Sequence, residues 1–208
     1  NLSILIKKIL DETTIRRLRV SSIQPQEIDE DLLSNWRYDK RLCPHFHVPL
    51  QSGSDKILKS MRRKYDLKMY ENSVNQIRSM LPNSSVTTDI IAGYPGEDEN
   101  DHESSKEFLD SLLLADAHVF KYSDRPGTTS MYLKNKVPSK IINSRAYELR
   151  HISSLNKSNY LNSMIGQIRE VLWEDSMGNS GLTDNYIRVK LSKKIPPNTK
   201  IIENTINS

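Results

Sequence analysis

The chain has 208 residues, of which 36% are hydrophobic and 27% are charged, and its formal net charge is +4. This length suits one ordinary domain and a small second one, with a core of ordinary size. No run approaches the roughly 20 apolar residues of a membrane helix, and the first residues lack a signal-peptide pattern, so we expect a cytoplasmic protein without membrane contact. The single cysteine, Cys43, excludes an internal disulfide framework and a metal cluster held by several thiolates of this chain.

Strands and helices alternate in the first part of the chain. Hydrophobic periodicity predicts helices at 2–10, 29–36, 55–61, 67–80 and 99–114, and strands at 18–22, 45–50, 85–92 and 117–122. We expect these strands to be parallel, because a helix between two consecutive strands is the usual crossover of a parallel pair. The sequence therefore predicts an α/β fold over residues 1–138.

The pattern changes after Pro138. A long helical stretch follows at 139–164, and β-branched residues then alternate with polar ones at 168–173 and 186–191. These patterns predict a basic helical connector over 139–164 and a small antiparallel β module over 165–208.

Small or polar residues follow each of the four predicted strands of the first part. Ligands of parallel α/β folds lie at the carboxyl ends of the strands, so these loops are expected to share one site. Their hydroxyls, one amide and free backbone N–H groups suit hydrogen bonds to ribose, carboxylate and adenine edges better than covalent attack. Ordinary turn chemistry would explain any one loop, but four together favour a site. The loops are residues 21–22, 51–54, 93–97 and 123–127.

Charge is unevenly distributed along the chain. Residues 81–120 contain nine acids and one base, whereas residues 121–160 contain eight bases and two acids. A basic segment of this kind can neutralise phosphates and favours nucleic-acid binding. A solvated helix face explains the same pattern about equally well.

Two histidines stand out as a possible metal pair. His45 and His47 alternate along a predicted strand and therefore point to one face. No third ligand has recognisable spacing, so a structural or substrate-facing role is favoured over metal binding. Ser52 and Ser54 lack the pattern of a nucleophile elbow, and residues 93–97 lack the Gly-Lys-Ser of a phosphate loop, so hydrolase and nucleoside triphosphatase functions are disfavoured.

Four segments resemble the radical S-adenosylmethionine (SAM) methylthiotransferases in sequence, order and spacing. They are residues 18–25, residues 43–55 with Pro-Leu-Gln-Ser-Gly-Ser, residues 88–97 with Gly-Tyr-Pro-Gly-Glu, and residues 122–128. Residues 181–189 resemble the TRAM domain of the branch that methylthiolates N6-threonylcarbamoyladenosine in tRNA, next to the anticodon. The resemblance implies the C-terminal part of a partial (β/α)6 barrel, strands 3 to 6, followed by an incomplete TRAM-like module.

The resemblance also implies cofactors and site residues. In such enzymes a reduced 4Fe-4S cluster cleaves SAM to a 5'-deoxyadenosyl radical, which activates an adenine C–H for insertion of a methylthio group. A branched side chain at Gly93 or Gly96 is expected to fill space that the ligand needs. The residues implied to bind SAM are Ser21, Ser22, Gln51, Ser52, Gly53, Ser54, Asp89, Gly93, Pro95, Gly96, Glu97 and Arg125, and those implied to bind tRNA are Lys134, Lys136, Lys140, Arg145 and Arg188.

The chain departs from this family in its cysteines. The family has a Cys-x-x-x-Cys-x-x-Cys loop for the radical cluster and further cysteines for a second cluster, and none of them is in this chain. We therefore expect the clusters to be bound by residues missing from this chain, in the same or a separate chain, so that this chain alone is inactive. It would then be a fragment, a split subunit or a decayed remnant. Two other functions stay open: a non-catalytic tRNA- or RNA-binding remnant, and a metal-dependent barrel enzyme that uses His45 and His47.

Overall fold

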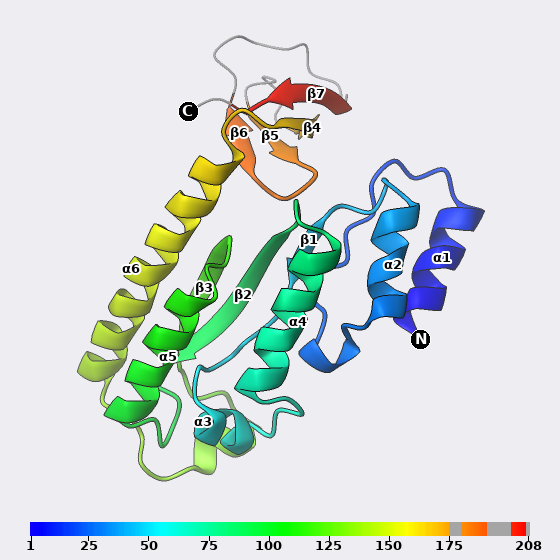
Figure 1. The fold of residues 1–208 in the computed structure, drawn as a ribbon. Coiled ribbons are helices and arrows are strands. Elements are labelled where there is room, and N and C mark those ends of the chain that lie inside the picture. Colours follow the sequence, from blue (N-terminus) through cyan, green and yellow to red (C-terminus); the bar gives the residue numbers. More distant parts are fainter. Residues whose placement is uncertain (175–179, 191–200, 207–208) are drawn as a thin grey trace.

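The computed structural model describes residues 1–174, 180–190 and 201–206 (Figure 1). Its first part contains, in chain order, α1 (Leu2–Glu12), the 3-10 helix η1 (Pro25–Glu27), α2 (Glu30–Tyr38), β1 (His45–His47), α3 (Asp55–Ser60), α4 (Leu67–Met80), β2 (Ser85–Ala92), α5 (Glu99–Ser111) and β3 (Asp116–Lys121). The second part contains the 3-10 helix η2 (Thr129–Tyr132), α6 (Ser139–Met164), β4 (Ile168–Trp173), β5 (Ser180–Thr183), β6 (Arg188–Lys190) and β7 (Ile201–Thr205). Among the described residues, no helix has the length and apolar character needed to cross a membrane.

Aspartates fix where three of the helices begin. The side chains of Asp29, Asp66 and Asp98 each accept a hydrogen bond from the backbone N–H three residues later, at the starts of α2, α4 and α5. These bonds satisfy N–H groups that have no partner within the helix, and the carboxylates also favour the positive end of the helix dipole. Local sequence therefore sets these helix starts.

The strands of the first part form a parallel sheet. The strand order is β1-β2-β3, and β2 pairs with both neighbours in parallel. The expected α/β class with parallel strands is thus confirmed.

Residues 18–23 run beside β1 but do not form a regular strand. The Leu18 N–H donates to the Arg41 carbonyl over 2.7 Å, and the Ile23 N–H donates to the His47 carbonyl over 3.0 Å. Between these two bonds, the six residues 18–23 lie opposite the seven residues 41–47, so the register shifts by one residue and the ladder is interrupted. The strand expected at 18–22 is therefore reduced to an isolated bridge between Leu18 and Leu42.

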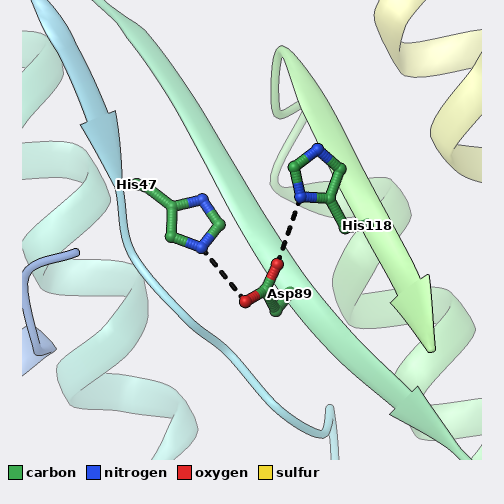
Figure 2. A group of neighbouring side chains, drawn as sticks. All are labelled: His47, Asp89 and His118. Atoms are coloured by element: carbon green, nitrogen blue, oxygen red, sulfur yellow. Dashed lines mark ion pairs between the residues drawn. The ribbon is translucent and has the colours of Figure 1, made fainter. Parts of the chain in front are cut away.

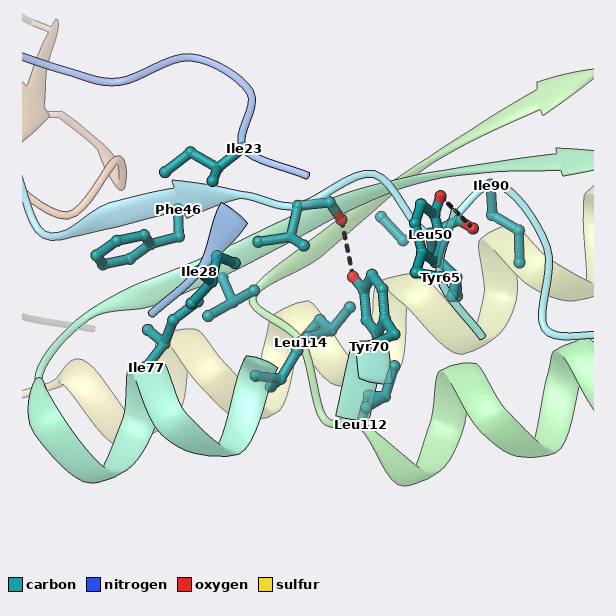
Figure 3. Packing of buried hydrophobic residues seen from close by; sticks show 14 of the residues in the cluster. Ile23, Ile28, Phe46, Leu50, Tyr65, Tyr70, Ile77, Ile90, Leu112 and Leu114 are labelled. Carbon is teal, nitrogen blue, oxygen red and sulfur yellow. Dashed lines mark hydrogen bonds between the residues drawn. The ribbon is translucent and has the colours of Figure 1, made fainter. Parts of the chain in front are cut away.

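One face of the sheet carries the apolar core. Val86, Ile90 and Ala92 alternate along β2 and are buried together with helix residues that include Val74 and Leu109. Figure 3 shows this packing. Tyr70 is fully buried within it, and its hydroxyl donates to the Val48 carbonyl over 2.8 Å. The buried phenol is therefore satisfied, and it ties α4 to the segment after β1.

Helix α6 carries the chain from the carboxyl ends of the parallel strands back toward their amino ends. It begins directly after Pro138, and it packs on β3 and α5 (Figure 1). Its observed bounds are those expected from the sequence. Because it returns along the sheet, it delivers the next residues to the amino ends of the parallel strands.

The second part forms an antiparallel sheet, as expected. Its strand order is β6-β5-β4-β7, and all three pairings are antiparallel. The expected strand at 186–191 is shorter, because residues 184–186 form the turn before β6 and Leu191 lies outside the described residues. This module contacts the amino end of β2, where the Ser85 hydroxyl donates to the Asn185 carbonyl over 2.6 Å.

Candidate functional site

Three of the four predicted loops meet at the carboxyl edge of the parallel sheet. The Gln51 N–H donates to the Asp89 carbonyl, and the Ile91 N–H donates to the Gln51 carbonyl, over 2.8 and 2.9 Å. On the other side of β2, the Tyr122 N–H donates to the Ala92 carbonyl over 2.9 Å. The loops after β1, β2 and β3 therefore leave the sheet side by side, which is the arrangement that a shared ligand site needs.

Ser21 and Ser22 do not lie at this edge. They are exposed and directly precede Ile23, whose N–H bonds to the carbonyl of His47. This position is beside the last residue of β1, four residues before Gln51. The expectation that all four loops share one edge therefore fails for this loop, because it lies beside His47 and not beside Gln51, where the other three loops meet.

Much of the loop after β1 holds the fold together. The Gly53 N–H donates to the Ser105 hydroxyl over 3.1 Å, and a Cβ at Gly53 would collide with the backbone of Ser105. Ser54 caps α3, and its hydroxyl donates to the buried Asp101 carboxylate over 2.7 Å. Ser52 is buried, and its hydroxyl accepts from the N–H of Ser54. The sequence Ser-Gly-Ser thus packs this loop onto α5.

Gln51 is the residue of this loop that is available to a ligand. Its backbone has a φ of +69°, which is unusual for a residue with a side chain. The residue is half-buried at the edge where the loops meet. Its strained backbone and its position between the sheet and solvent are features that cluster at binding sites.

Gly93 and Gly96 differ in how much space surrounds the position that a Cβ would occupy. Both have positive φ, +80° and +88°. A Cβ at Gly93 would collide with the side chain of Ile142 on α6, so this glycine is needed for helix packing. Among the described residues, no atom lies within 4 Å of the Cβ position of Gly96, so a ligand can approach its backbone closely. The expectation of ligand space therefore fits Gly96, and at Gly93 it fails because Ile142 fills that space.

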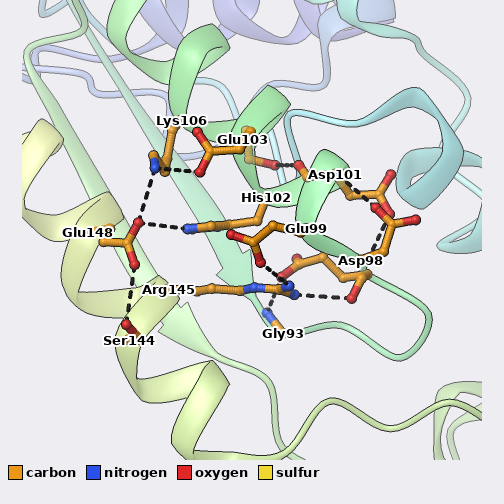
Figure 4. Close-up of polar contacts among 12 residues, drawn as sticks. Gly93, Asp98, Glu99, Asp101, His102, Glu103, Lys106, Ser144, Arg145 and Glu148 are labelled. Atoms are coloured by element: carbon orange, nitrogen blue, oxygen red, sulfur yellow. Dashed lines mark hydrogen bonds and ion pairs between the residues drawn. The ribbon is translucent and has the colours of Figure 1, made fainter.

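Glu97 is held in a buried ion pair rather than offered to a ligand. Its carboxylate accepts from the Arg145 guanidinium over 2.9 Å and from the Gly93 N–H over 3.0 Å. Arg145 also donates to the Glu99 carboxylate over 3.0 Å. Figure 4 shows Arg145 reaching from α6 toward Gly93 and Glu99. Burial raises the pKa of Glu97, and the Gly93 N–H and the Arg145 guanidinium offset part of that rise.

The basic residues expected to contact tRNA fall into two groups. Lys134 and Lys140 are exposed, as is Arg125 on the loop after β3. Lys136 and Arg188 are also exposed, but each forms an ion pair, with Asp124 and Glu174. Arg145 is 5% exposed, so its guanidinium faces carboxylates and not solvent. A run of basic residues in the sequence cannot distinguish a surface cation from the inner half of a buried pair.

The second face of the sheet is polar near its centre. We call His45, His47, Ser85, Thr87, Asp89 and His118 the polar face, since they alternate with core residues along β1, β2 and β3 and are neighbours in the strand register. Within it, the Asp89 carboxylate lies 3.1 Å from His47 Nε2 and 3.3 Å from His118 Nδ1 (Figure 2). Strand pairing thus joins residues that are far apart in the sequence.

A single hydroxyl links the two histidines of β1. Thr87 Oγ1 lies 2.9 Å from His45 Nε2 and 3.0 Å from His47 Nδ1. His45 is buried against the ring of Tyr186, with centroids 4.3 Å apart, and burial followed by the nearby charge of Arg19 lowers its pKa to about 3. The alternation of His45 and His47 therefore brings both rings to the same hydroxyl.

His118 is the residue that sequence reasoning missed. An isolated histidine gives no motif, and its role depends on the pairing of β3 with β2, which sets it directly opposite Asp89. The only signal in the sequence was the two-residue alternation along 116–121, which assigns His118 to one face of the strand. The strand register is also needed to place His118 opposite Asp89.

The thiol of this chain does not suit an iron–sulfur cluster. Such clusters are held by several cysteine thiolates, and the chain has Cys43 alone. Cys43 is 3% exposed, and burial raises the pKa of its thiol, which disfavours the thiolate. The one cysteine of these 208 residues cannot by itself hold a 4Fe-4S cluster.

Comparison with known proteins identifies the superfamily of this chain. The sequence profile of the radical SAM superfamily matches residues 3–109, about half of the chain. The chain belongs to the radical SAM superfamily. The solved structure of coproporphyrinogen III oxidase HemN from Escherichia coli, a radical SAM enzyme, superposes with a TM-score of 0.56 at 16% identity over 80% of this chain and 37% of that one, which concerns the fold alone.

Curated relatives within this superfamily are tRNA methylthiotransferases. The threonylcarbamoyladenosine tRNA methylthiotransferase MtaB of Aquifex aeolicus is 36% identical over 91% of this chain and 46% of its own length. The tRNA-2-methylthio-N(6)-dimethylallyladenosine synthase of Methylacidiphilum infernorum is 34% identical over 94% of this chain and 42% of its own length. The resemblance inferred from the sequence is thereby confirmed. This radical SAM chain spans less than half the length of these relatives.

Proposed function

We propose that the chain is the SAM-binding and tRNA-binding part of a methylthiotransferase that adds a methylthio group to C2 of N6-threonylcarbamoyladenosine next to the anticodon. The observation that carries this proposal is that three strand-end loops meet at the carboxyl ends of the parallel sheet in a member of the radical SAM superfamily. The curated relatives of the chain are enzymes that modify tRNA adenosines. In this proposal residues 1–138 are part of a partial (β/α)6 barrel, and 165–208 form a TRAM-like module.

The SAM site is assigned to the groups that the fold leaves available at this edge. The Gln51 amide and the Arg125 guanidinium supply polar contacts suited to ribose and carboxylate oxygens. The open side of Gly96 admits the flat adenine close to the backbone. Pro95 stiffens the turn between the two glycines, and Asp89 lies on β2, three residues before the end of the strand. Five of the other predicted residues, Ser52, Gly53, Ser54, Gly93 and Glu97, hold these loops in position, and Ser21 and Ser22 are not assigned to the site.

The tRNA contacts are assigned to exposed bases near α6 and in the β module. Lys134 and Lys140 are exposed, and the ion pair of Lys136 with Asp124 brings the segment next to Lys134 to the loop that carries Arg125. Contacts of this kind bind phosphates without reading the base sequence. Lys136 and Arg188 contribute only if their carboxylate partners are displaced, and Arg145 is not proposed as a tRNA contact.

Cluster binding is assigned to residues outside these 208, in the same or a separate chain. The donor set described above supports this assignment, since Cys43 is buried and is the only cysteine. The chemistry of radical formation therefore belongs to that other part. This chain would bind and orient SAM and tRNA.

Deletion of the reading frame that encodes these residues, followed by mass spectrometry of the tRNA nucleosides, tests the proposal. We expect loss of the 2-methylthio derivative of N6-threonylcarbamoyladenosine and accumulation of its unthiolated precursor, both reversed by a plasmid copy. Loss of the dimethylallyl derivative instead would contradict the substrate assignment. Unchanged nucleosides would contradict the proposed function as a whole, whereas lost modification excludes a purely RNA-binding role.

A further inference from the structure

Three potential metal-ligand atoms lie together on the polar face. They are His47 Nε2, a carboxylate oxygen of Asp89 and His118 Nδ1, and all lie within 4.8 Å of one another. Each comes from a different strand, β1, β2 and β3 (Figure 2). Two imidazoles and one carboxylate form a ligand set that suits zinc and other first-row divalent cations.

The sheet itself holds these three residues in place. Asp89 is paired directly with His118 in the β2–β3 register, and His47 is paired with Thr87, two residues before Asp89. Ligands on neighbouring strands need no loop ordering to converge. Their backbones are therefore fixed before a cation binds, which reduces the entropic cost of binding.

A second contact orients the His47 ring. Its Nδ1 lies 3.0 Å from Thr87 Oγ1, and this leaves Nε2 pointing at Asp89. Metal-binding histidines ordinarily engage the other ring nitrogen in this way, since that bond sets the tautomer and the ring direction. Thr87 in turn touches His45, so the supporting contact is anchored in the buried part of the sheet.

Two of the three separations match ligands around one ion. Asp89 Oδ2 lies 3.1 Å from His47 Nε2, and Asp89 Oδ1 lies 3.3 Å from His118 Nδ1. Two ligand atoms that are each about 2.1 Å from a zinc ion lie about 3.0–3.4 Å apart for angles between 90° and tetrahedral. Direct N–H to carboxylate hydrogen bonds have similar lengths, so a cation would replace these two bonds with little movement of the heavy atoms.

Solvent reaches the cluster from the side of β3. The exposed fraction of the side chain is 14% for His47, 26% for Asp89 and 53% for His118. A cation can therefore enter past His118 and keep at least one coordination position open to water. An open position is the feature that separates reactive metal sites from closed structural ones.

We propose that His47, Asp89 and His118 bind one divalent cation of the zinc type on the polar face. The site involves none of the proposed contacts of SAM or tRNA except Asp89, and it stands whether or not the proposed function holds. It replaces the His45 and His47 pair suggested by strand alternation. His45 contacts Thr87 through its Nε2 and supports the hydroxyl that orients His47.

Zinc titration of the complete 208-residue chain tests the proposal. After treatment with a chelator, calorimetry with zinc chloride at neutral pH should give one equivalent bound, and cobalt should give a visible spectrum of low-symmetry coordination. His118→Ala and Asp89→Asn should each weaken binding by at least about tenfold, and Thr87→Val by about tenfold through the ring of His47. His151→Ala, at an exposed position of α6, is the matched control and should bind as the unchanged chain does.

Two results would overturn the proposal. One is the absence of saturable zinc binding by the unchanged chain. The other is binding that persists undiminished in His118→Ala, which would place the ion elsewhere. His118 is exposed, so this variant should keep the circular dichroism spectrum and unfolding midpoint of the unchanged chain. If His118→Ala were unfolded, Asp89→Asn would serve, because its side-chain amide keeps the shape and one acceptor oxygen.

Discussion

Replacing Arg145 by methionine should lower the free energy of unfolding, because it leaves the buried carboxylate of Glu97 without its cation. The side chains of Arg145 and Glu97 are 7% and 3% exposed, and their charged atoms are 2.9 Å apart. Methionine retains much of the buried aliphatic volume but leaves Glu97 with the Gly93 N–H as its remaining partner among the contacts described above. Loss of one partner of a buried ion pair costs about 3–5 kcal/mol, because the other charge stays desolvated. We expect a loss of that size in the free energy of unfolding.

The size of this loss should depend on pH in a defined direction. Burial already raises the pKa of Glu97 above its ordinary value, and removal of the guanidinium raises it further. A carboxyl whose pKa is higher in the folded than in the unfolded state binds more protons when folded, so its stabilising contribution is present at low pH and is lost as pH rises through the folded pKa. Arg145→Met should therefore be most harmful above that pKa and less harmful below it.

Urea unfolding followed by circular dichroism, at about pH 8 and about pH 5, measures both effects. Lys140→Met is the control, because Lys140 is an exposed residue of the same helix. Adding Glu97→Gln to Arg145→Met should restore part of the stability at the higher pH, since the buried group is then neutral. A loss below about 1 kcal/mol, or a loss independent of pH, would refute the role assigned to this pair.

Three further changes test separate parts of the structure. Gly96→Ala should cost about 1–2 kcal/mol for its positive φ alone, whereas Gly93→Ala should cost more because its Cβ also meets Ile142; equal urea midpoints would contradict this difference. Lys134→Glu with Lys140→Glu should weaken tRNA binding and lower its salt slope by about one per lost phosphate contact, while Lys7→Glu on α1 should not; an unchanged slope would exclude this surface. Tyr186→Ala should loosen the β module by about 1–2 kcal/mol, because its ring stacks on His45 and lies under Arg19, and hydrogen exchange in β5 should rise; unchanged exchange would exclude that anchoring role.

The sequence was a good guide to the elements and to the sheet class. Strong periodicity predicted the ends of α4, β2 and α6 to within one residue, because an apolar helix face or an alternating strand leaves a local pattern in the sequence. The strand at 18–22 failed for a non-local reason. Its regularity depends on its register with residues 41–48, which the segment itself does not encode.

The candidate site was predictable in position more than in the role of each residue. The loops after β1, β2 and β3 do meet at one edge, as strand-end reasoning requires. Gly53, Ser54 and Glu97 are nevertheless bonded to α5 or α6, because their partners Ser105, Asp101 and Arg145 come from helices far along the chain. The grouping of His118 with Asp89 depends in the same way on strand pairing.

Titration of the isotope-labelled chain with SAM, followed by backbone amide NMR, tests most directly the claim that the strand-end loops bind the cofactor. We expect saturable shifts at Gln51, Gly96 and Arg125, with little change at Tyr186 and Ile187 in the β module. Shifts confined to the β module, or no saturable shift at any described residue, would contradict the claim.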